Sequence, residues 1–331
     1  MTANHSESAT IKEALEGSTK IFLALHINPD GDSVGSNLAI SSYLQSLGKE
    51  VEIWASDAPP INLDFLPEFN AIINKDPHDA DLEKFDLVVL LDSPEVARIT
   101  RHEHLGLPTQ KVVVIDHHET NTKFGSVNLV DDKASSTGEI LYRLFQDWGA
   151  SVNSEIATDL LTAIAADTGT FRWVTSENTL DAASQLIKCG ADLEMINFNL
   201  YNRTPLREIQ YQAEVVRKLK QETLAKFNFV WSATSYPEIE SLGGTEFAVG
   251  GSDIAKTIDG INFALVLREE EKGVMTGSLR SRTEVDVAKI ASMFGGGGHV
   301  AAAGFMIRFS GSFEEKVKEV IGQVKEYLNN L

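Results

Sequence analysis

Three short apolar runs in the first 120 residues each lead into a charged side chain, and this feature limits the folds that the chain can adopt. The runs Lys20 to Leu25, Leu87 to Leu91 and Lys111 to Ile115 are followed by His26, Asp92 and Asp116. Runs rich in β-branched residues and leucine are typical of strands buried on both faces of a parallel sheet. In an open α/β sheet the carboxyl ends of such strands meet at one edge, so these side chains are expected to converge there.

Other candidate ligands lie near the same edge. Asp30 and Asp32 stand in a short turn after the first run, and apolar residues at helical spacing from Ile156 to Ile164 predict a helix that ends at Asp167, just before Gly169. The resulting set has four carboxylates, two imidazoles and no thiolate: His26, Asp30, Asp32, Asp92, His117 and Asp167.

This set of ligands indicates the kind of metal ion. Hard oxygen ligands favour Mn²⁺ or Mg²⁺ over a structural zinc ion, and the imidazoles shift the preference toward Mn²⁺, with Mg²⁺ and Co²⁺ left open. Six ligands are too many for one ion. Two ions about 3.5–4 Å apart, sharing one carboxylate and a water, are the usual arrangement for phosphate ester hydrolysis.

At these residues the chain resembles the DHH phosphoesterase family. The segment from His26 to Ser36 is similar to the first family motif, Asp92 to the second, Asp116-His117-His118 to the motif that gives the family its name, and Asp167 to the fourth. Segments 277–282 and 294–304 are similar to the substrate-binding motifs of the DHH-associated C-terminal domain. The resemblance therefore covers all but about the first ten residues. Within the family, the length and motifs are most similar to stand-alone oligoribonucleases, the nanoRNases, which degrade very short RNAs and dephosphorylate 3′-phosphoadenosine 5′-phosphate.

The resemblance implies a role for each residue. His26 and Asp30 would hold one ion, Asp32, His117 and Asp167 the other, and Asp92 would bridge them. Two residues would act in catalysis: Asp116 would orient an imidazole, and His118 would bind a phosphate oxygen or protonate the leaving group. A terminal phosphate would be gripped by charged side chains and by a glycine segment whose backbone amides can approach an anion closely: Arg280, Arg282, Gly295, Gly296, Gly297, Gly298 and His299.

The fold class expected is α/β, with two domains, because 331 residues exceed the length at which single cores stop growing, about 250–300 residues. The expected architecture is a parallel-sheet DHH domain with helices on both faces and a smaller C-terminal α/β domain, with the active site in the cleft between them. The expected boundaries are a disordered tail (1–10), the catalytic metal-binding domain (11–190), a linker with a helix (191–219) and the substrate-binding domain (220–331). Helices are predicted from a capping box at Thr10 to Glu13 and over 33–47, 136–148, 178–188, 205–219, 285–293 and 313–328, and C-terminal strands over 227–232, 262–268, 274–281 and 305–309.

The charge composition of the chain limits the ligands that it is expected to bind. Lys and Arg total 29 against 48 Asp and Glu, which gives a formal net charge of −19. Such a chain repels long polyanions, so short RNA oligonucleotides and mononucleotides are expected rather than long nucleic acid. One cysteine, Cys189, excludes an intramolecular disulfide, and no apolar run approaches the about 20 residues of a membrane span. A cytoplasmic protein without a membrane partner is expected, and a homodimer is left open.

Four alternatives compete with the nanoRNase hypothesis. A phosphodiesterase for cyclic or linear dinucleotides, such as c-di-AMP or pApA, would use the same motifs. An inorganic pyrophosphatase shares the first domain but not the motifs around Arg280, and a RecJ-type exonuclease normally has further nucleic-acid-binding domains. A nucleotide-sensing protein without catalysis would not need every ligand. The segment from Gly250 to Thr257 has Ala255 where a phosphate-binding loop requires glycine, so no nucleotide site is predicted there.

Overall fold

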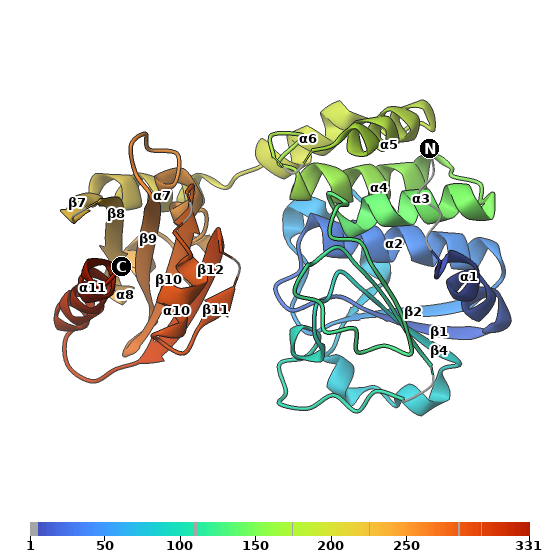
Figure 1. Ribbon diagram of the computed structural model, residues 1–331, viewed down its shortest axis with the longest axis horizontal. Helices are drawn as coiled ribbons and strands as arrows, with labels where there is room; N and C mark the ends of the chain where they lie inside the picture. Colours follow the sequence, from blue (N-terminus) through green and yellow to red (C-terminus); the bar gives the residue numbers. More distant parts are fainter. Residues whose placement is uncertain (1–5, 109–110, 174, 225, 284, 299) are drawn as a thin grey trace. The chain divides into compact units, whose positions relative to one another are not determined.

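The three apolar runs form neighbouring strands of one parallel sheet, as the sequence predicts. The computed structural model describes residues 6–108, 111–173, 175–224, 226–283, 285–298 and 300–331, and its chain divides into two compact units, 1–203 and 204–331 (Figure 1). In the first unit the strand order is β3-β2-β1-β4-β5-β6, and every pairing is parallel. The strands are β1 (Lys20–Ala24), β2 (Glu50–Ala55), β3 (Ile72–Asn74), β4 (Leu87–Leu91), β5 (Val112–Asp116) and β6 (Val127–Val130).

Alternate side chains of the central strands enter two different cores. Leu23 and Val89 pack with the α-helices of this unit, whereas Phe22 and Val88 point into a smaller core closed by short turns and loops. The helices are α1 (Ser8–Gly17), α2 (Gly31–Ser46), α3 (Thr137–Trp148), α4 (Ser154–Asp167), α5 (Glu177–Lys188) and α6 (Leu193–Tyr201), and the 3₁₀ turns are η1 (Ile61–Leu63), η2 (Phe69–Ala71), η3 (Pro77–Asp79), η4 (Leu82–Lys84) and η5 (Val96–Arg98).

The fold class is confirmed, but one detail of the prediction differs. In the described part of the first unit, the core on the second face contains no residue of an α-helix, so α-helices do not cover both faces. The connections that cross this face hold Pro77, Pro94 and Pro108, and proline removes a backbone donor and breaks helices. Short 3₁₀ turns are what such segments can form.

Helices α2 and α4 pack unusually closely, and this contact positions the functional edge of the sheet. A Cβ atom on Gly35 would come closer than 3.0 Å to the carbonyl oxygen of Asp159 and would lie 3.2 Å from the nitrogen of Ala163. A Cβ on Gly31 would collide with the side chain of Ala166 in the same way. Only glycine allows the two backbones to approach this far.

Two predicted boundaries need correction. Helix α1 begins at Ser8, not at the capping box at Thr10, because the indole of Trp148 donates to the carbonyl and hydroxyl oxygens of Ser8 and ties the first turn to α3. Residues 8–10 are therefore helical, and the rest of the expected tail up to residue 5 lies outside the described residues. Segment 191–219, expected as a linker with one helix, holds α6 in the first unit and α7 (Leu206–Arg217) in the second.

The second unit is built on a mixed sheet with the order β11-β12-β10-β9-β8-β7. Helices α10 and α11 pack on one face, and α7 and its neighbours pack on the other. The predicted strands and helices are confirmed to within a few residues. The elements are β7 (Lys220–Leu224), β8 (Phe227–Thr234), α8 (Tyr236–Ser241), η6 (Thr245–Phe247), α9 (Gly251–Ala255), β9 (Phe263–Glu271), β10 (Val274–Ser281), α10 (Val287–Ser292), β11 (Gly297–Gly298), β12 (Ala302–Arg308) and α11 (Phe313–Asn329).

Across the residues described, no helix has both the length and the apolar character that crossing a membrane requires.

Candidate metal centre

Asp92 lies at the centre of the candidate site. It directly follows β4, its side chain is 2% exposed, and its φ of +54° is in the left-handed region that non-glycine residues rarely adopt. One carboxylate oxygen, Oδ2, lies 3.3 Å from Nε2 of His26, and the other, Oδ1, lies 3.4 Å from Nε2 of His117. The two oxygens of one buried carboxylate thus face two different imidazoles, which is the arrangement that a bridging ligand requires. Backbone strain of this kind is concentrated at functional sites.

The first group of ligands comprises His26, Asp30 and Asp92. Nδ1 of His26 lies 3.0 Å from the carbonyl oxygen of Ile27, which can only accept, so Nε2 is directed at the carboxylates. Nε2 lies 3.7 Å from Oδ1 of Asp30. That same oxygen accepts hydrogen bonds from the backbone amides of Asp32 and Ser33 at 3.1 Å each, because Asp30 is the N-cap of α2.

The second group comprises Asp32, His117 and Asp167. Nε2 of His117 lies 3.1 Å from Oδ2 of Asp167 and 3.7 Å from Oδ2 of Asp32. Asp167 is the last residue of α4, where the sequence predicted it. Within each of the two groups the candidate ligand atoms lie within 4.8 Å of one another. Two groups that meet at Asp92 could hold two adjacent divalent ions.

The N-terminus of α3 supports Asp32, and sequence reasoning missed this contact. The backbone amides of Thr137 and Gly138 donate to its two oxygens at 2.7 and 2.9 Å, and the hydroxyl of Ser36 donates at 2.9 Å. A carboxylate at a helix N-terminus is stabilised by the helix dipole and by the unpaired first-turn amides. The capping serine Ser136 predicted where this helix begins, but nothing in the sequence indicated that it begins beside Asp32.

Electrostatics in the site favour bound cations. Burial, together with the negative charges of Asp92 and Asp167, raises the pKa of Asp32 well above its usual range. Burial also raises the pKa of Asp167 to about 6, although its hydrogen bond with His117 opposes the shift. Burial opposes a charge on His117, yet hydrogen bonds to Asp167 and Asp92 raise its pKa. Asp32 and Asp167 thus favour their protonated forms because they are buried beside other carboxylates, and two divalent cations would supply the missing positive charge. The oxygen and imidazole donors fit such ions.

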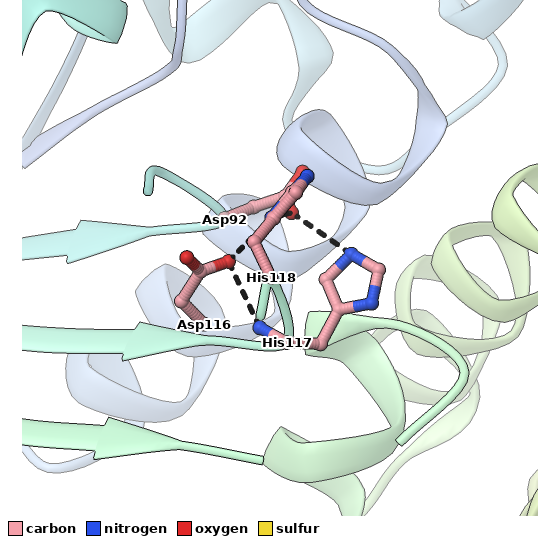
Figure 2. Close-up of side chains that lie close together, drawn as sticks. All are labelled: Asp92, Asp116, His117 and His118. Carbon is pink, nitrogen blue, oxygen red and sulfur yellow. Dashed lines mark hydrogen bonds and ion pairs between the residues drawn. The ribbon is translucent and has the colours of Figure 1, made fainter. Parts of the chain in front are cut away.

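Asp116 orients the two histidines that follow it (Figure 2). It ends β5 and is fully buried. Its Oδ1 accepts from the backbone amide of His117 at 2.8 Å and lies 2.7 Å from Nδ1 of His118, and its Oδ2 accepts from the side-chain amide of Asn121 at 2.6 Å. The carboxylate therefore fixes the ring of His118, with Nδ1 as the protonated nitrogen. Asn121 is a further residue that the sequence gave no reason to select.

The second unit brings Arg280 close to the glycine segment. Strand β10 pairs with β12 and β12 with β11, so that Arg280 lies opposite Ala302 and Gly298 lies opposite Ala303. Two strand spacings separate Arg280 from the glycines, about 10 Å. The glycines are not a loose loop, because Gly297 and Gly298 form β11.

The structure also describes three more of the residues predicted to bind the terminal phosphate. A Cβ on Gly296 would collide with the carbonyl of Gly304, so this position accepts no side chain, and Gly295 has a φ of +74°. The guanidinium of Arg282 donates to the carbonyl of Ile258 at 3.1 Å. His299 lies outside the described residues.

Asp253 holds the guanidinium of Arg280. Oδ1 of Asp253 lies 3.2 Å from Nε of Arg280 and 2.7 Å from Nζ of Lys256. Burial opposes ionisation of this carboxyl, but the two cations hold its pKa below the usual range. The carboxylate comes from the same Gly250 to Thr257 segment for which no nucleotide site was predicted, so its role as a support for Arg280 had no sequence signal.

Comparisons with known proteins identify the family of both units. Residues 20–167 match the DHH family, N-terminal domain, and residues 248–330 match the DHHA1 domain. The chain is 34% identical, over 97% of its length and 93% of the relative, to the bifunctional oligoribonuclease and PAP phosphatase NrnA of Thermus thermophilus. It is 27% identical, over 97% of its length but only 49% of the relative, to the cyclic-di-AMP phosphodiesterase PdeA of Listeria monocytogenes. The crystal structure of an exopolyphosphatase-related protein from Bacteroides fragilis superposes with a TM-score of 0.89 at 25% identity and covers 100% of this chain and 99% of that one.

Proposed function

Because the chain belongs to the DHH family of phosphoesterases, we propose that it hydrolyses short oligoribonucleotides and converts 3′-phosphoadenosine 5′-phosphate to AMP. The observation that most supports this function is the position of Asp92, whose two oxygens face the two ligand groups at 3.3 and 3.4 Å. The relative NrnA, matched over nearly the whole of both chains, is named for both activities. Similar length and similar domain content favour a common substrate class.

The proposed cofactors are two divalent ions, with Mn²⁺ preferred. His26 and Asp30 would hold one ion, Asp32, His117 and Asp167 the other, and Asp92 would belong to both. When bound, such ions withdraw charge from a phosphate ester and lower the pKa of a coordinated water. The mixed donor set of carboxylates and imidazoles supports Mn²⁺ over Mg²⁺.

The chain's own residues would position the substrate and move its proton. Because Asp116 accepts the Nδ1 proton of His118, a doubly protonated ring would give its Nε2 proton to the leaving oxygen and keep the proton on Nδ1. Arg280 and the glycine amides of 295–298, two strands away in the same sheet, would bind a terminal phosphate through charge-assisted hydrogen bonds. Four carboxylates offset the charge of two divalent ions, so substrate affinity has to come from such an anchor.

A second candidate function is hydrolysis of cyclic or linear dinucleotides. The identity of 27% to a cyclic-di-AMP phosphodiesterase across 97% of this chain supports it, but the chain matches only half of that protein. A nucleotide-sensing protein without catalysis has less support, because it would not need all six candidate ligands, and all six lie in groups that could hold a metal ion.

One assay separates these functions. Purified protein with Mn²⁺ is given pApA, RNAs of increasing length, 3′-phosphoadenosine 5′-phosphate, c-di-AMP and pyrophosphate in parallel, with EDTA and the Asp92→Asn variant as controls. The proposal expects short RNAs and 3′-phosphoadenosine 5′-phosphate to be the best substrates, with turnover lost in both controls. Faster hydrolysis of c-di-AMP than of either would favour the second candidate, and absence of all turnover would favour the sensing protein.

A further inference from the structure

The second unit contains a pocket of about 550 Å³ that none of the predicted site residues lines. It lies at the β7–β8 edge of the sheet, whereas Arg280 is in β10, on the other side of β9. Its size is within the range of small-molecule sites, about 300–1,000 Å³. The pocket is therefore separate from the proposed phosphate anchor.

Three elements enclose this pocket. Trp231 and Ala233 of β8 form its floor, and Phe313 and Val317 from the first turns of α11 form one wall. Residues 217–220, at the junction between α7 and β7, supply a further part of the lining. The floor and one wall are thus apolar and partly aromatic.

Two ammonium groups of the lining have no carboxylate within 4.0 Å among the described residues, although Glu222, which accepts from the indole of Trp231 at 3.3 Å and pairs with Lys325, lies near Lys220. Arg217 is bonded to Glu214 at 2.5 Å and Lys218 to Glu238 at 2.5 Å. Lys220 and Lys318 also line the pocket, and neither has a carboxylate within 4.0 Å among the residues that the structure describes. The other acid in the lining is Glu314.

Lys220 and Lys318 thus place two cations beside one pocket of a chain whose net charge is −19. Elsewhere on α11, Lys316 is paired with Glu319 at 2.8 Å and Lys325 with Glu222 at 2.8 Å. A pocket walled by unpaired cations attracts an anion. Helix α11 begins at this pocket, but Ser312 caps one of its first-turn amides and Glu314 and Glu315 stand in that turn, so the attraction comes from the lysines.

The floor of the pocket adds an aromatic surface next to one of these cations. Nζ of Lys220 lies 4.6 Å from the centre of the Trp231 ring, a cation–π contact that holds the ammonium at the floor. Trp231 is only partly buried, so a flat ring has indole surface to pack against. The preferred ligand is therefore both anionic and aromatic.

We propose that this pocket is a second nucleotide site, which binds a nucleoside monophosphate without hydrolysing it. The phosphate would lie between Lys220 and Lys318, and the base would pack on Trp231 and Phe313. The choice of a nucleoside monophosphate rests on the proposed function, because such compounds are its products, whereas the anionic and aromatic character of the ligand follows from the lining alone. No group of metal-ligating residues found in the described chain contributes to this lining.

Photolabelling of the full chain with 8-azido-AMP in EDTA tests the proposal without requiring turnover. Label is expected in the peptides that contain residues 217–235 or 313–318, and AMP should compete for it at lower concentrations than adenosine or inorganic phosphate. The double variant Lys220→Gln/Lys318→Gln should lose this label about tenfold or more, as expected when charge-assisted contacts are removed. Lys316→Gln, on the same helix but outside the lining, is the matched control and should label normally.

Three results would overturn the proposal. The first is label found only in peptides of the first unit. The second is equal labelling of the double variant and the parent when both have the same thermal stability. The third is competition by inorganic phosphate or adenosine that is as strong as competition by AMP. Loss of catalysis in the substrate panel with the pocket label retained would refute the proposed function and leave this site standing. Normal turnover without the pocket label would refute the second nucleotide site and leave the proposed function standing.

Discussion

Replacing Gly35 by alanine should damage both the stability of the first unit and its metal centre. The added Cβ would enter the contact between α2 and α4, closer than 3.0 Å to the carbonyl oxygen of Asp159 and 3.2 Å from the nitrogen of Ala163. Both neighbours are backbone atoms, which cannot rotate away as a side chain could. The helices would have to separate by about 1 Å to restore ordinary contact distances.

The magnitude follows from two opposing effects. Alanine is favoured over glycine within a helix by about 0.5–1 kcal/mol, and overpacking a tight contact costs about 1–3 kcal/mol. Because the two backbone atoms cannot move aside, the cost of overpacking should lie near the upper end of its range. The free energy of unfolding should therefore fall by about 2 kcal/mol in total. For a unit of this size, a loss of that order lowers Tm by roughly 4–8 °C.

The metal centre should respond as well, because α2 provides Asp30 and Asp32 while α4 provides Asp167. Thermal unfolding and titration of Mn²⁺ against a competing chelator measure the two effects, and Mn²⁺ affinity should fall about tenfold or more. Gly322→Ala in α11 is the control: nothing lies within 4 Å of its added Cβ, so it should raise stability by about 0.4–1 kcal/mol and leave Mn²⁺ binding unchanged. A Gly35→Ala protein that is as stable as the parent, or that binds Mn²⁺ equally well, would refute the role of this contact.

Three further predictions concern charge. Arg280→Ala should keep its full metal content, measured by elemental analysis, and weaken nucleotide hydrolysis by about 1.5–3 kcal/mol in kcat/KM, whereas metal loss would show that the residue is misplaced. Burial and the nearby Glu155 raise the pKa of Asp159, so this carboxyl should make the parent less stable as pH rises from about 4 toward that raised pKa, by up to about 1.4 kcal/mol per pH unit. In urea unfolding from pH 4 to 8, Asp159→Asn should lose less stability than the parent, because the contribution of Asp159 is removed while those of Asp32 and Asp167 remain. Hydrolysis should be fastest on RNAs of about two to five nucleotides and show a salt slope of about one to two phosphate contacts, and processive degradation of long RNA would contradict it.

The sequence predicted the candidate metal ligands because each stands at a position that local rules identify. His26, Asp92 and Asp116 follow apolar runs whose pattern is that of buried parallel strands, and Asp167 follows a run at helical spacing. Parallel strands place their carboxyl ends together, so convergence follows from topology alone. The same reasoning located α3, whose capping serine and terminal Gly149 are both observed.

The residues that the sequence did not predict act through contacts between distant segments. The amides of Thr137 and Gly138 reach Asp32 across more than a hundred residues, and Asn121 and Asp253 are common polar residues without a motif. Their roles depend on how helices and loops pack, which no local pattern encodes. The prediction of α-helices on both faces of the first sheet was wrong for the same reason, because only the folded chain shows which connections cross the second face.

Supporting contacts of this kind explain how four carboxylates can share one small site. An isolated cluster of buried acids would remain protonated, because desolvation and mutual repulsion both oppose ionisation. Here three of the four acids have their own source of positive potential, and Asp167 shares His117 with Asp92. The α3 amides face Asp32, the α2 amides face Asp30, and two imidazoles face Asp92. Those contacts keep the oxygens in place, while the raised pKa values of Asp32 and Asp167 show that compensation is incomplete without cations. A site built in this way binds divalent ions in exchange for protons, so its metal affinity should rise with pH until those two carboxyls are ionised.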